Sequence, residues 1–455
     1  MSVYLLFDVG STYTKGVLVD ITKEKIVATA SSMTTAETDI RFGIESIKSQ
    51  MGEILEQVNI TKTLVCSSAK GGLTMISVGL IPDLTLKAAI LACYSAGAKV
   101  IGSYSFELNQ HEIEEIETSN CDILLLCGGT NGGNSTVVIN NAKRIASIRR
   151  KLPIIYAGNK SCQDQVNEIL NNAGFECTLC DNVMPSYGVL EVNECRNRIR
   201  EIFLDHIIKA KGLSSLSTLI EEIILPTPYS VMEALKLLAK GTLNERGLGD
   251  LMAIDIGGAT TDVYSMNSTI VIADHVDFKG LQEPLEKRSV EGDLGVRFNA
   301  KHVLALKKNE TEITVEFNQY ISQFATDRYI VPNPIFDQQL AKWCCEIAAE
   351  RHAGRIDSVF TPMGVSYYQQ GKNLRDVKIM IGIGGPILYS SHPEEILEKA
   401  LYDDRKTEIL LPYKTEYYLD SHYVISCLGL LASRHPDEVL RILKKNVEKL
   451  NNDQR

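Results

Sequence analysis

Short apolar runs alternate with amphipathic stretches along most of the chain, and this pattern predicts strands that alternate with helices. Near the N-terminus it predicts strands over residues 3–9, 15–20 and 26–31, a helix over 43–58 and a strand over 63–66. Strands that are each followed by a helix are typical of a mostly parallel sheet with helices packed on it. The sequence therefore predicts an α/β fold.

The same pattern starts again near residue 95. It predicts strands over 121–127, 153–157 and 176–179 and helices over 136–148 and 163–172. We expect a small open α/β domain here, inserted into the first half of the chain.

The remaining segments complete two larger halves. A helix is predicted over 191–211, a helix break at Leu225-Pro226-Thr227-Pro228, a helix over 229–240 that ends at Gly241, and a final amphipathic helix over 436–450. A second α/β region begins at residue 251. The predicted division is 1–94 plus 186–248 for the first half, 95–185 for the inserted domain and 249–455 for the second half.

Composition narrows the classes of function. Of the 455 residues 44% are apolar and 23% are charged, as in ordinary globular proteins. A net charge of −10 argues against broad binding to nucleic acid or membrane surfaces, since both need clustered Lys and Arg. The apolar runs are far shorter than the roughly 18 residues of a membrane span, and the N-terminus lacks a signal-peptide pattern. We expect a cytoplasmic protein.

The cysteines and histidines show no metal-binding spacing. Cys177 and Cys180 form a lone C-x-x-C among eleven cysteines, and a zinc ribbon needs a second such pair. We expect the cysteines to be mostly small buried hydrophobic residues in a reducing compartment.

One short pattern occurs twice, about 245 residues apart. Asp8-Val9-Gly10 and Asp255-Ile256-Gly257 each follow an apolar strand and precede small residues, Ser or Thr, and another strand. Glycine lets backbone N–H groups approach phosphate oxygens, and the aspartate at the strand end can hold waters of a Mg²⁺ ion. One such turn is ordinary, but two that each open an α/β half predict a triphosphate gripped from both sides.

The pair resembles the phosphate-1 and phosphate-2 motifs of the superfamily that holds actin, hexokinase and the heat-shock chaperone ATPases. Lys15 follows Asp8 at the spacing of the phosphate-contacting lysine of actin. Residues 255–263 are similar to the chaperone motif D-x-G-G-G-T-x-D-V, although Ala259 departs from its third glycine. The resemblance assigns Thr260 to the γ-phosphate and Asp262 to the Mg²⁺ or attacking-water shell.

Further motifs follow in the order of this superfamily. Residues 226–235 resemble its connect-1 helix, 380–386 its adenosine motif, 426–432 its connect-2 helix, and 291–295 a segment of the chaperones. The resemblance implies an actin-like, ribonuclease H-like ATPase fold of two duplicated halves, with the small open α/β domain inserted.

The motifs together imply a set of site residues. The implied catalytic residues are Asp8, Lys15, Asp255 and Asp262, and the three aspartates would also hold Mg²⁺, through water. The implied ATP contacts come from Gly10, Ser11, Thr12, Lys15, Gly257, Gly258, Thr260, Thr261, Glu291, Gly384, Gly385 and Pro386. Glu291 and Asp293 either orient the attacking water or have a structural role.

A narrower resemblance covers almost the full length. Cys66-Ser67-Ser68-Ala69-Lys70-Gly71-Gly72, Cys127-Gly128-Gly129-Thr130-Asn131-Gly132-Gly133-Asn134 and Lys287-Arg288-Ser289-Val290-Glu291-Gly292-Asp293 resemble the glutamate mutase accessory protein L family, also called MutL. This resemblance implies an ATP-driven reactivating chaperone that exchanges damaged cobalamin on adenosylcobalamin-dependent glutamate mutase or a related mutase. It implies no cobalamin site on this chain, and 95–185 is the candidate partner-facing domain.

Several alternatives stay open. A small-molecule kinase of the same superfamily, an ATP-driven reductive activator with an Fe–S cluster, and a scaffold that binds nucleotide without turnover fit parts of the pattern. The loop 128–134 either binds an anion at a helix N-terminus or is a plain turn. Cys66-Ser67-Ser68 either carries a nucleophile or is a turn at a strand end.

Overall fold

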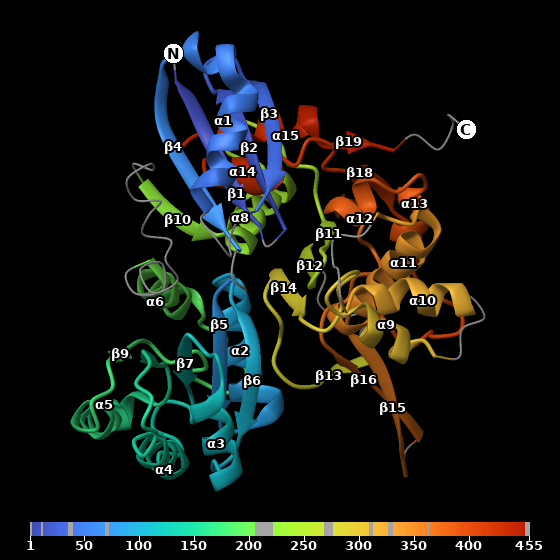
Figure 1. The fold of residues 1–455 in the computed structure, drawn as a ribbon. Coiled ribbons are helices and arrows are strands. Elements are labelled where there is room, and N and C mark those ends of the chain that lie inside the picture. The colour runs from blue at the N-terminus through green and yellow to red at the C-terminus, as the bar shows by residue number, and fades with distance from the viewer. Residues whose placement is uncertain are drawn as a thin grey trace. The chain divides into compact units, whose positions relative to one another are not determined.

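The computed structural model describes residues 2–10, 12–34, 40–68, 72–204, 222–267, 276–308, 313–325, 331–362 and 364–450 (Figure 1). The chain divides into two compact units. The first comprises Met1–Met232 and Gly280–Pro284, and the second comprises Glu233–Lys279 and Leu285–Arg455. Each unit is described by itself.

The first unit opens with a five-stranded sheet in the order β10-β4-β1-β2-β3. The strands are β1 (Val3–Val9), β2 (Tyr13–Asp20), β3 (Lys25–Met33), β4 (Ile60–Ser67) and β10 (Glu222–Pro226). β2 runs antiparallel to β1 and β3, whereas β4 runs parallel to β1 and β10. Helix α1 (Ile40–Glu56) packs on β3 and β2, and helix α8 (Thr227–Lys240) follows β10.

The sheet of the second unit repeats this arrangement in the order β14-β12-β11-β17-β18-β19. Its strands are β11 (Leu251–Ile256), β12 (Thr261–Met266), β14 (Glu286–Glu291), β17 (Ile379–Ile383), β18 (Glu416–Leu419) and β19 (Glu448–Lys449). β12 is antiparallel to β11 and β14, and β17 is parallel to β11 and β18. Five strands thus have the same order and directions in both units. The predicted duplicated, ribonuclease H-like fold of the actin type is confirmed.

A third sheet belongs to the first unit and is entirely parallel, in the order β6-β5-β7-β8-β9. The strands are β5 (Thr74–Gly79), β6 (Lys99–Ser105), β7 (Ile123–Leu126), β8 (Ile154–Tyr156) and β9 (Cys177–Leu179). The helices are α2 (Lys87–Ser95), α3 (Gln110–Thr118), α4 (Thr136–Ile145), α5 (Gln163–Asn172) and α6 (Asn193–Ile202). This is the doubly wound order of flavodoxin-like sheets. The independence of 95–185 as a domain stays a prediction.

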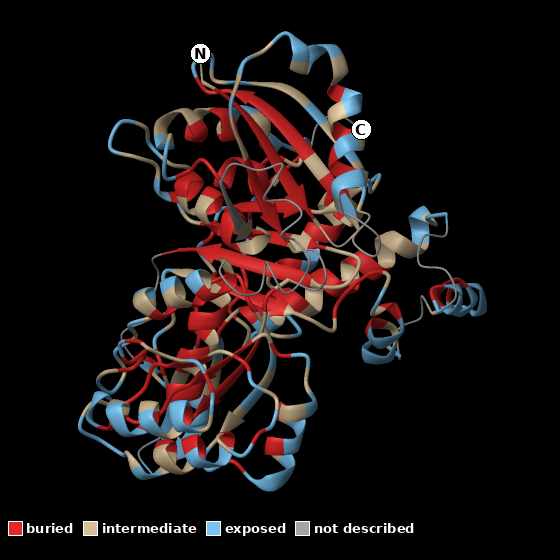
Figure 2. Cartoon of the chain, turned by 60° about the vertical axis from the view of Figure 1, so that its left-hand side comes forward, coloured by how far each residue is buried: buried red, intermediate tan, exposed pale blue. Residues whose placement is uncertain are grey.

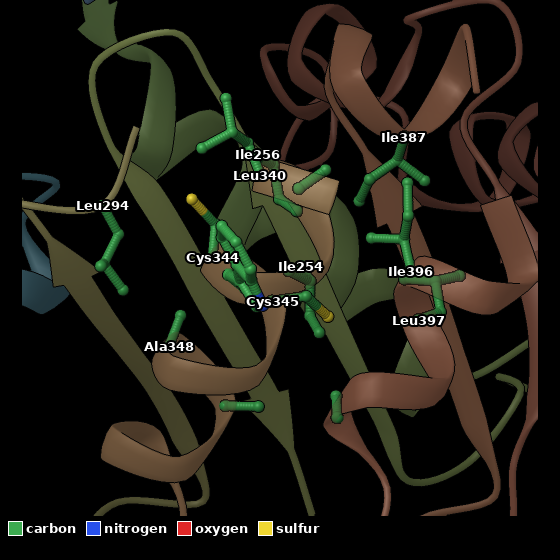
Figure 3. Close-up of a cluster of buried hydrophobic side chains, with 14 of the residues drawn as sticks. Ile254, Ile256, Leu294, Leu340, Cys344, Cys345, Ala348, Ile387, Ile396 and Leu397 are labelled. Carbon is green, nitrogen blue, oxygen red and sulfur yellow. The ribbon is translucent and has the colours of Figure 1, made fainter. Parts of the chain in front are cut away.

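The core of the second unit forms around α11 (Pro334–His352). Asn333 caps this helix, because its side chain accepts hydrogen bonds from the N–H groups of Ile335 and Phe336. Cys344 and Cys345 are fully buried beside strand β11 (Figure 3). Burial raises the pKa of the Cys344 thiol to about 12, so it packs as a neutral apolar group.

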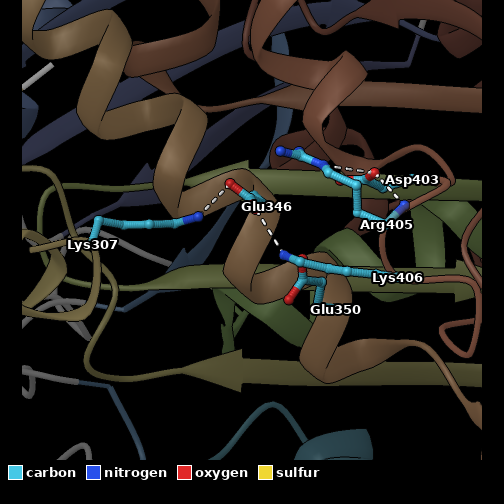
Figure 4. Close-up of polar contacts among 6 residues, drawn as sticks. All are labelled: Lys307, Glu346, Glu350, Asp403, Arg405 and Lys406. Atoms are coloured by element: carbon cyan, nitrogen blue, oxygen red, sulfur yellow. Dashed lines mark hydrogen bonds and ion pairs between the residues drawn. The ribbon is translucent and has the colours of Figure 1, made fainter. Parts of the chain in front are cut away.

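Other elements complete the second unit. They are α9 (Ala300–Leu306), α10 (Val315–Gln323), α12 (Gly385–Leu388), α13 (Pro393–Leu397), α14 (Ile425–Gly429), α15 (Pro436–Asn446) and a small sheet of β13 (Val276–Phe278), β16 (Gly364–Gln370) and β15 (Arg355–Thr361). Buried residues concentrate in the sheets, and the helices keep an exposed side (Figure 2). On α11 the half-buried Glu346 pairs with Lys307 at 2.6 Å and Lys406 at 3.0 Å (Figure 4).

Some element predictions are wrong at their ends. Residues 225–226 were expected in a helix break, but they close strand β10, and α8 starts at once at Thr227. The final helix stops at Asn446 rather than 450, because Glu448 and Lys449 pair with β18. Of the helix predicted over 191–211, α6 covers Asn193–Ile202, and 205–211 lie outside the described residues.

None of the helices that the structure describes combines the length and the apolar character needed to cross a bilayer.

Candidate functional site

The first Asp–Gly turn joins β1 to β2. The N–H of Gly10 donates to the carbonyl of Tyr13 at 3.0 Å and closes the turn. A Cβ on Gly10 would lie 2.7 Å from that carbonyl oxygen, so no side chain fits. Thr34 N donates to Thr12 O at 2.8 Å and fixes the turn to the end of β3. Ser11, a predicted phosphate contact, lies outside the described residues.

Asp8 is buried at the end of β1, just before this turn. Its Oδ1 accepts a 2.6 Å hydrogen bond from the hydroxyl of Thr227, the first residue of α8. The thiol of Cys66 lies 3.6 Å from the same oxygen. Lys15 is paired directly opposite Asp8 on β2, and its Nζ is 4.0 Å from Oδ2. The structure thus brings the predicted Asp8 and Lys15 together and adds Thr227.

Cys66 is fully buried, and its thiol contacts Asp8 and the carbonyl of Phe7. Ser67 is also buried, and its hydroxyl donates to Val9 O at 3.3 Å. Both side chains therefore fasten β4 to β1, which favours the structural interpretation of this segment over a nucleophile.

The second turn, between β11 and β12, closes in the same way. Gly257 N donates to Thr260 O at 2.9 Å. The carbonyls of the turn point back into the unit: Gly257 O accepts from Val296 N at 3.2 Å, and Gly258 O accepts from Phe298 N at 2.8 Å. The N–H groups of Gly258 and Thr260 have no acceptor among the residues that the structure describes.

Asn299 binds the remaining carbonyl of the second turn. Its side-chain amide donates to Ala259 O at 2.6 Å and to Gly292 O at 3.0 Å. These donors hold the carbonyls of Gly257, Gly258 and Ala259. The N–H groups of the same turn therefore have a fixed direction, away from the carbonyls. Successive backbone N–H groups held in this way form an anion-binding concavity.

Asp255 and Asp262 lie directly opposite each other on β11 and β12. Like charges in this arrangement repel, so the pair requires a compensating cation. Arg288 of β14 supplies one, with its Nη2 2.6 Å from Asp262 Oδ1. Of the two predicted threonines, Thr261 is fully buried and donates to Leu294 O, whereas the hydroxyl of Thr260 is 3.5 Å from Asp262 Oδ2.

Glu291 and Asp293 share one cation. Arg351 of α11 lies 2.7 Å from Glu291 Oε2 and 2.8 Å from Asp293 Oδ1, and His302 lies 3.1 Å from Asp293 Oδ2. Burial raises the pKa of Glu291, although Arg351 opposes this shift. Burial also tends to raise the pKa of Asp293, but the hydrogen bond and charge of Arg351 outweigh burial, and the pKa of that carboxyl is lowered. This geometry favours a structural ion pair for both acids.

The predicted adenosine turn meets the end of β11. Gly384 has a φ of 91°, and a Cβ there would lie 2.3 Å from Ile256 O and 2.7 Å from Asp255 Oδ1. Gly385 opens helix α12, and Pro386 lies in its first turn. A Cβ on Gly385 would be 3.2 Å from the hydroxyl of Tyr423.

Tyr423 and Tyr389 are residues of this region that the motifs missed. Their rings lie 6.2 Å apart, and Tyr389 is largely exposed. Burial raises the pKa of Tyr423 well above its usual value, and Tyr389 and Asp255 act in the same direction. The position of Tyr389, three residues after Pro386, was the only signal for it in the sequence.

The loop 128–134 follows β7 and is held by two buried asparagines. Asn159 accepts from Gly132 N at 3.0 Å and donates to Gly133 O at 3.1 Å. Asn182 donates to Gly129 O and to Asn131 Oδ1, both at 3.0 Å. The loop is therefore an ordered feature at the carboxyl ends of the parallel strands, where sheets of this order bind ligands.

A metal ion at the second turn would need oxygen ligands from that turn and its flanking strands. Within the described residues no three metal-ligating side chains converge. Mg²⁺ usually takes one or two carboxylates together with waters and phosphate oxygens, so a full protein cage is not required. The opposed carboxylates of Asp255 and Asp262 offer oxygen ligands of this kind.

Comparison with known proteins identifies the family. A family model described as MutL protein matches residues 4–447. The chain is 45% identical over 462 residues to Protein MutL of Clostridium tetanomorphum, covering 99% of this chain and 100% of that protein.

Solved structures give weaker likenesses. An activator of the 2-hydroxyisocaproyl-CoA dehydratase from Clostridium difficile with bound ADPNP aligns at 12% identity over 99% of both chains, with a TM-score of 0.32. Ligand-bound xylulose kinase from Lactobacillus acidophilus aligns at 10% identity over 99% of this chain and 93% of that one, with a TM-score of 0.37. The fold assignment rests on the strand order of the two sheets, and the family assignment rests on the two sequence matches. The chain, as its motifs predict, belongs to the MutL protein family.

Proposed function

We propose that this protein binds and hydrolyses ATP to reactivate adenosylcobalamin-dependent glutamate mutase, or a related mutase, by driving exchange of damaged cobalamin. The single observation that carries the nucleotide part is the repeated turn. Gly10 N donates to Tyr13 O and Gly257 N donates to Thr260 O, at equivalent points of two sheets with the same strand order. Family membership supports the accessory role.

In this proposal the two turns donate to the phosphates of ATP. Backbone N–H groups of Gly258, Ala259 and Thr260 would bind phosphate oxygens, and the ammonium of Lys15 would add a charge-assisted hydrogen bond. Gly384, Gly385 and Pro386 would admit the nucleoside. Glycine is required at Gly10 and at Gly384 because a Cβ at either position would meet a backbone oxygen. The absence of a side chain also leaves both turns open to a nucleotide.

Asp8, Asp255 and Asp262 would hold Mg²⁺ through water. When bound, the ion would neutralise charge that develops on the transferred phosphoryl group. Asp262 would orient water at the second turn, and Lys15 would bind the phosphates. Glu291 would act indirectly, through the end of β14, because Arg351 occupies its carboxylate.

Reactivation needs a difference between ATP-bound and ADP-bound protein. Shifting a two-state equilibrium from 1:99 to 99:1 takes about 5.5 kcal/mol of differential binding. The γ-phosphate contacts of Thr260 and of the turn N–H groups are the natural source of that difference. We propose that residues 95–185 face the mutase and that the chain has no cobalamin site of its own.

The deciding experiment measures ATP hydrolysis with Mg²⁺, alone and with purified glutamate mutase inactivated by damaged cobalamin. Recovery of mutase activity is expected only with ATP, fresh adenosylcobalamin and intact Asp8, so Asp8→Ala is the control. If ATP is hydrolysed but the mutase regains no activity, the proposed partner is wrong, and a screen for kinase substrates comes next.

A further inference from the structure

Strand β14 carries polar side chains on both of its faces, and one of them reaches the second Asp–Gly turn. On one face, Lys287 donates to the backbone carbonyl of His352, and Ser289 Oγ lies 2.8 Å from the ring nitrogen Nδ1 of the same histidine. Arg288, between them, points to the opposite face. It is paired with Tyr264 on β12, and Asp262 lies two residues earlier on the same face. Arg288 is therefore a diagonal cross-strand neighbour of Asp262.

The contact between the two side chains is close and buried. Arg288 Nε donates to Asp262 Oδ1 at 2.8 Å, and Nη2 lies 2.6 Å from the same oxygen. The side chains are only 3% and 12% exposed. Guanidinium stays charged at any physiological pH, so it compensates permanently for the removal of the carboxylate from water.

Both of these contacts with Asp262 fall on Oδ1. The other oxygen, Oδ2, is the one that faces Thr260, whose hydroxyl is 3.5 Å away. Arg288 thus fixes the carboxylate with one oxygen occupied and the other directed towards the turn. Without Arg288 the Asp262 carboxylate would be buried opposite Asp255 with its main compensating charge removed.

We propose that Arg288 is a positioning residue that holds Asp262 for the water bound to Mg²⁺, or for the attacking water, at the second turn. The inference rests on the proposed ATP-binding function and deepens it. Arg288 would touch neither nucleotide nor metal. Its removal should therefore weaken the effects of Mg²⁺ on the protein and leave Mg²⁺-free nucleotide binding almost unchanged.

The test uses the full chain with Arg288→Met, Arg288→Lys, Asp262→Asn and the double variant Arg288→Met/Asp262→Asn. ATP affinity is measured by calorimetry with Mg²⁺ and with EDTA, and turnover is measured in parallel. We expect Arg288→Met to weaken Mg²⁺-ATP binding about tenfold or more, as for loss of a charge-assisted hydrogen bond. In EDTA the change should stay below about threefold, and Arg288→Lys should recover part of the loss.

A double-mutant cycle separates positioning from general destabilisation. If Arg288 acts through Asp262, adding Arg288→Met to Asp262→Asn should cause little further loss of Mg²⁺-ATP affinity. Lys307→Met is the control, because Lys307 forms an ion pair with Glu346 at 2.6 Å in the same unit, at the end of α9. It should lower thermal stability without a selective effect on Mg²⁺.

Several outcomes overturn the inference. Equal effects of Arg288→Met in Mg²⁺ and in EDTA, or additive losses in the cycle, would show a purely structural residue. If Arg288→Met does not fold, Arg288→Lys decides, since it must show the same Mg²⁺-selective loss in weaker form. A wild-type protein that binds no ATP would overturn the proposed function together with this inference, whereas Mg²⁺-responsive binding that Arg288→Met leaves intact would overturn the inference alone.

Discussion

Lys15 and Asp262 occupy the same position in two copies of one hairpin. Lys15 is paired with Asp8 across β1 and β2, and Asp262 is paired with Asp255 across β11 and β12. The first copy therefore places a cation opposite its aspartate, and the second copy places another carboxylate there. The two hairpins have the same strand pairing but carry charges of opposite sign at this one position, where a lysine suits phosphate and an aspartate suits a metal ion.

This difference predicts distinct effects for two variants. Lys15→Ala should weaken ATP binding about tenfold to a hundredfold both with Mg²⁺ and with EDTA, since it removes a charge-assisted contact to phosphate. Asp262→Asn should weaken binding mainly when Mg²⁺ is present. Calorimetry on both variants checks this, with Lys23→Ala in the exposed turn between β2 and β3 as control. Equal sensitivity of both variants to Mg²⁺ would contradict the division of roles.

Thr227 links α8 to the first turn through its 2.6 Å hydrogen bond to Asp8. Thr227→Val keeps the shape of the side chain but leaves a buried carboxylate short of one donor. We expect a loss of about 1.5–3 kcal/mol in the stability of the first sheet, the range for hydrogen bonds to charged groups.

Amide hydrogen exchange in β1 measures this loss, because the protection of β1 depends on opening of its sheet. Thr227→Ser restores the hydroxyl and should recover most of the protection. Unchanged exchange in Thr227→Val would mean that water replaces the threonine hydroxyl at Asp8.

The sequence was sufficient to predict the contacts that form within one hairpin. Asp8 and Lys15 meet because a tight turn between two strands places residues seven apart opposite each other, and the same holds for Asp255 and Asp262. The repeated motif also predicted the duplicated fold, since each copy begins a sheet of the same order.

Contacts between distant segments could not be predicted in this way. Arg288 reaches Asp262 from 26 residues away through the pairing of β14 with β12, and Thr227 reaches Asp8 from 219 residues away through the position of α8. The register of strand pairs and the placement of helices depend on packing of the whole unit. A hydrophobic pattern does not specify these features residue by residue.

Gly384 offers a test of close packing at the proposed nucleoside turn. Its φ of 91° is matched by Gly249, with a φ of 92° in the same unit, but a Cβ on Gly249 would meet no atom within 4 Å. Gly249→Ala should cost about 1–2 kcal/mol for the left-handed backbone alone. Gly384→Ala should cost about 1–3 kcal/mol more, because its Cβ would meet Ile256 O.

Urea unfolding followed by the fluorescence of Trp343 measures both variants. Trp343 is the only tryptophan and is buried in the second unit, so it reports on that unit alone. Equal midpoints for the two variants would contradict the predicted contact at Gly384.

Asn159 permits a test of the proposed partner-facing region without cutting the parallel sheet. A deletion of 95–185 would remove four of its strands entirely and leave β5 without its partners. Asn159→Ala instead removes only the side chain that holds Gly132 and Gly133 in the loop.

We expect Asn159→Ala to increase hydrogen exchange at Gly132 and to weaken mutase binding in a pull-down, while basal ATP turnover stays at the wild-type level. Asn171→Ala is the control, because the side chain of Asn171 makes an exposed hydrogen bond to Asn167 on α5, away from the loop. A loosened loop that binds the mutase as well as wild type would show that this loop does not contact the partner.

His352 predicts how the second unit responds to acid. Its ring is fully buried between Ser265 and Ser289, each at 2.8 Å. Burial lowers the pKa of His352 well below 6.5, and the ammonium groups of Lys287 and Lys372 lower it further. The unfolded chain takes up this proton below about pH 6.5 while the folded unit does not.

The stability that depends on neutral His352 is therefore complete above about pH 6.5 and is lost as the pH falls below that value. The loss from this one group is at most about 1.4 kcal/mol per pH unit. His352→Gln cannot titrate, so its stability should fall less steeply than that of wild type between pH 6.5 and 5, as followed by Trp343 fluorescence in urea. Parallel pH profiles for the two proteins would mean that His352 is already protonated in the folded unit, which its two serine partners and two neighbouring lysines oppose.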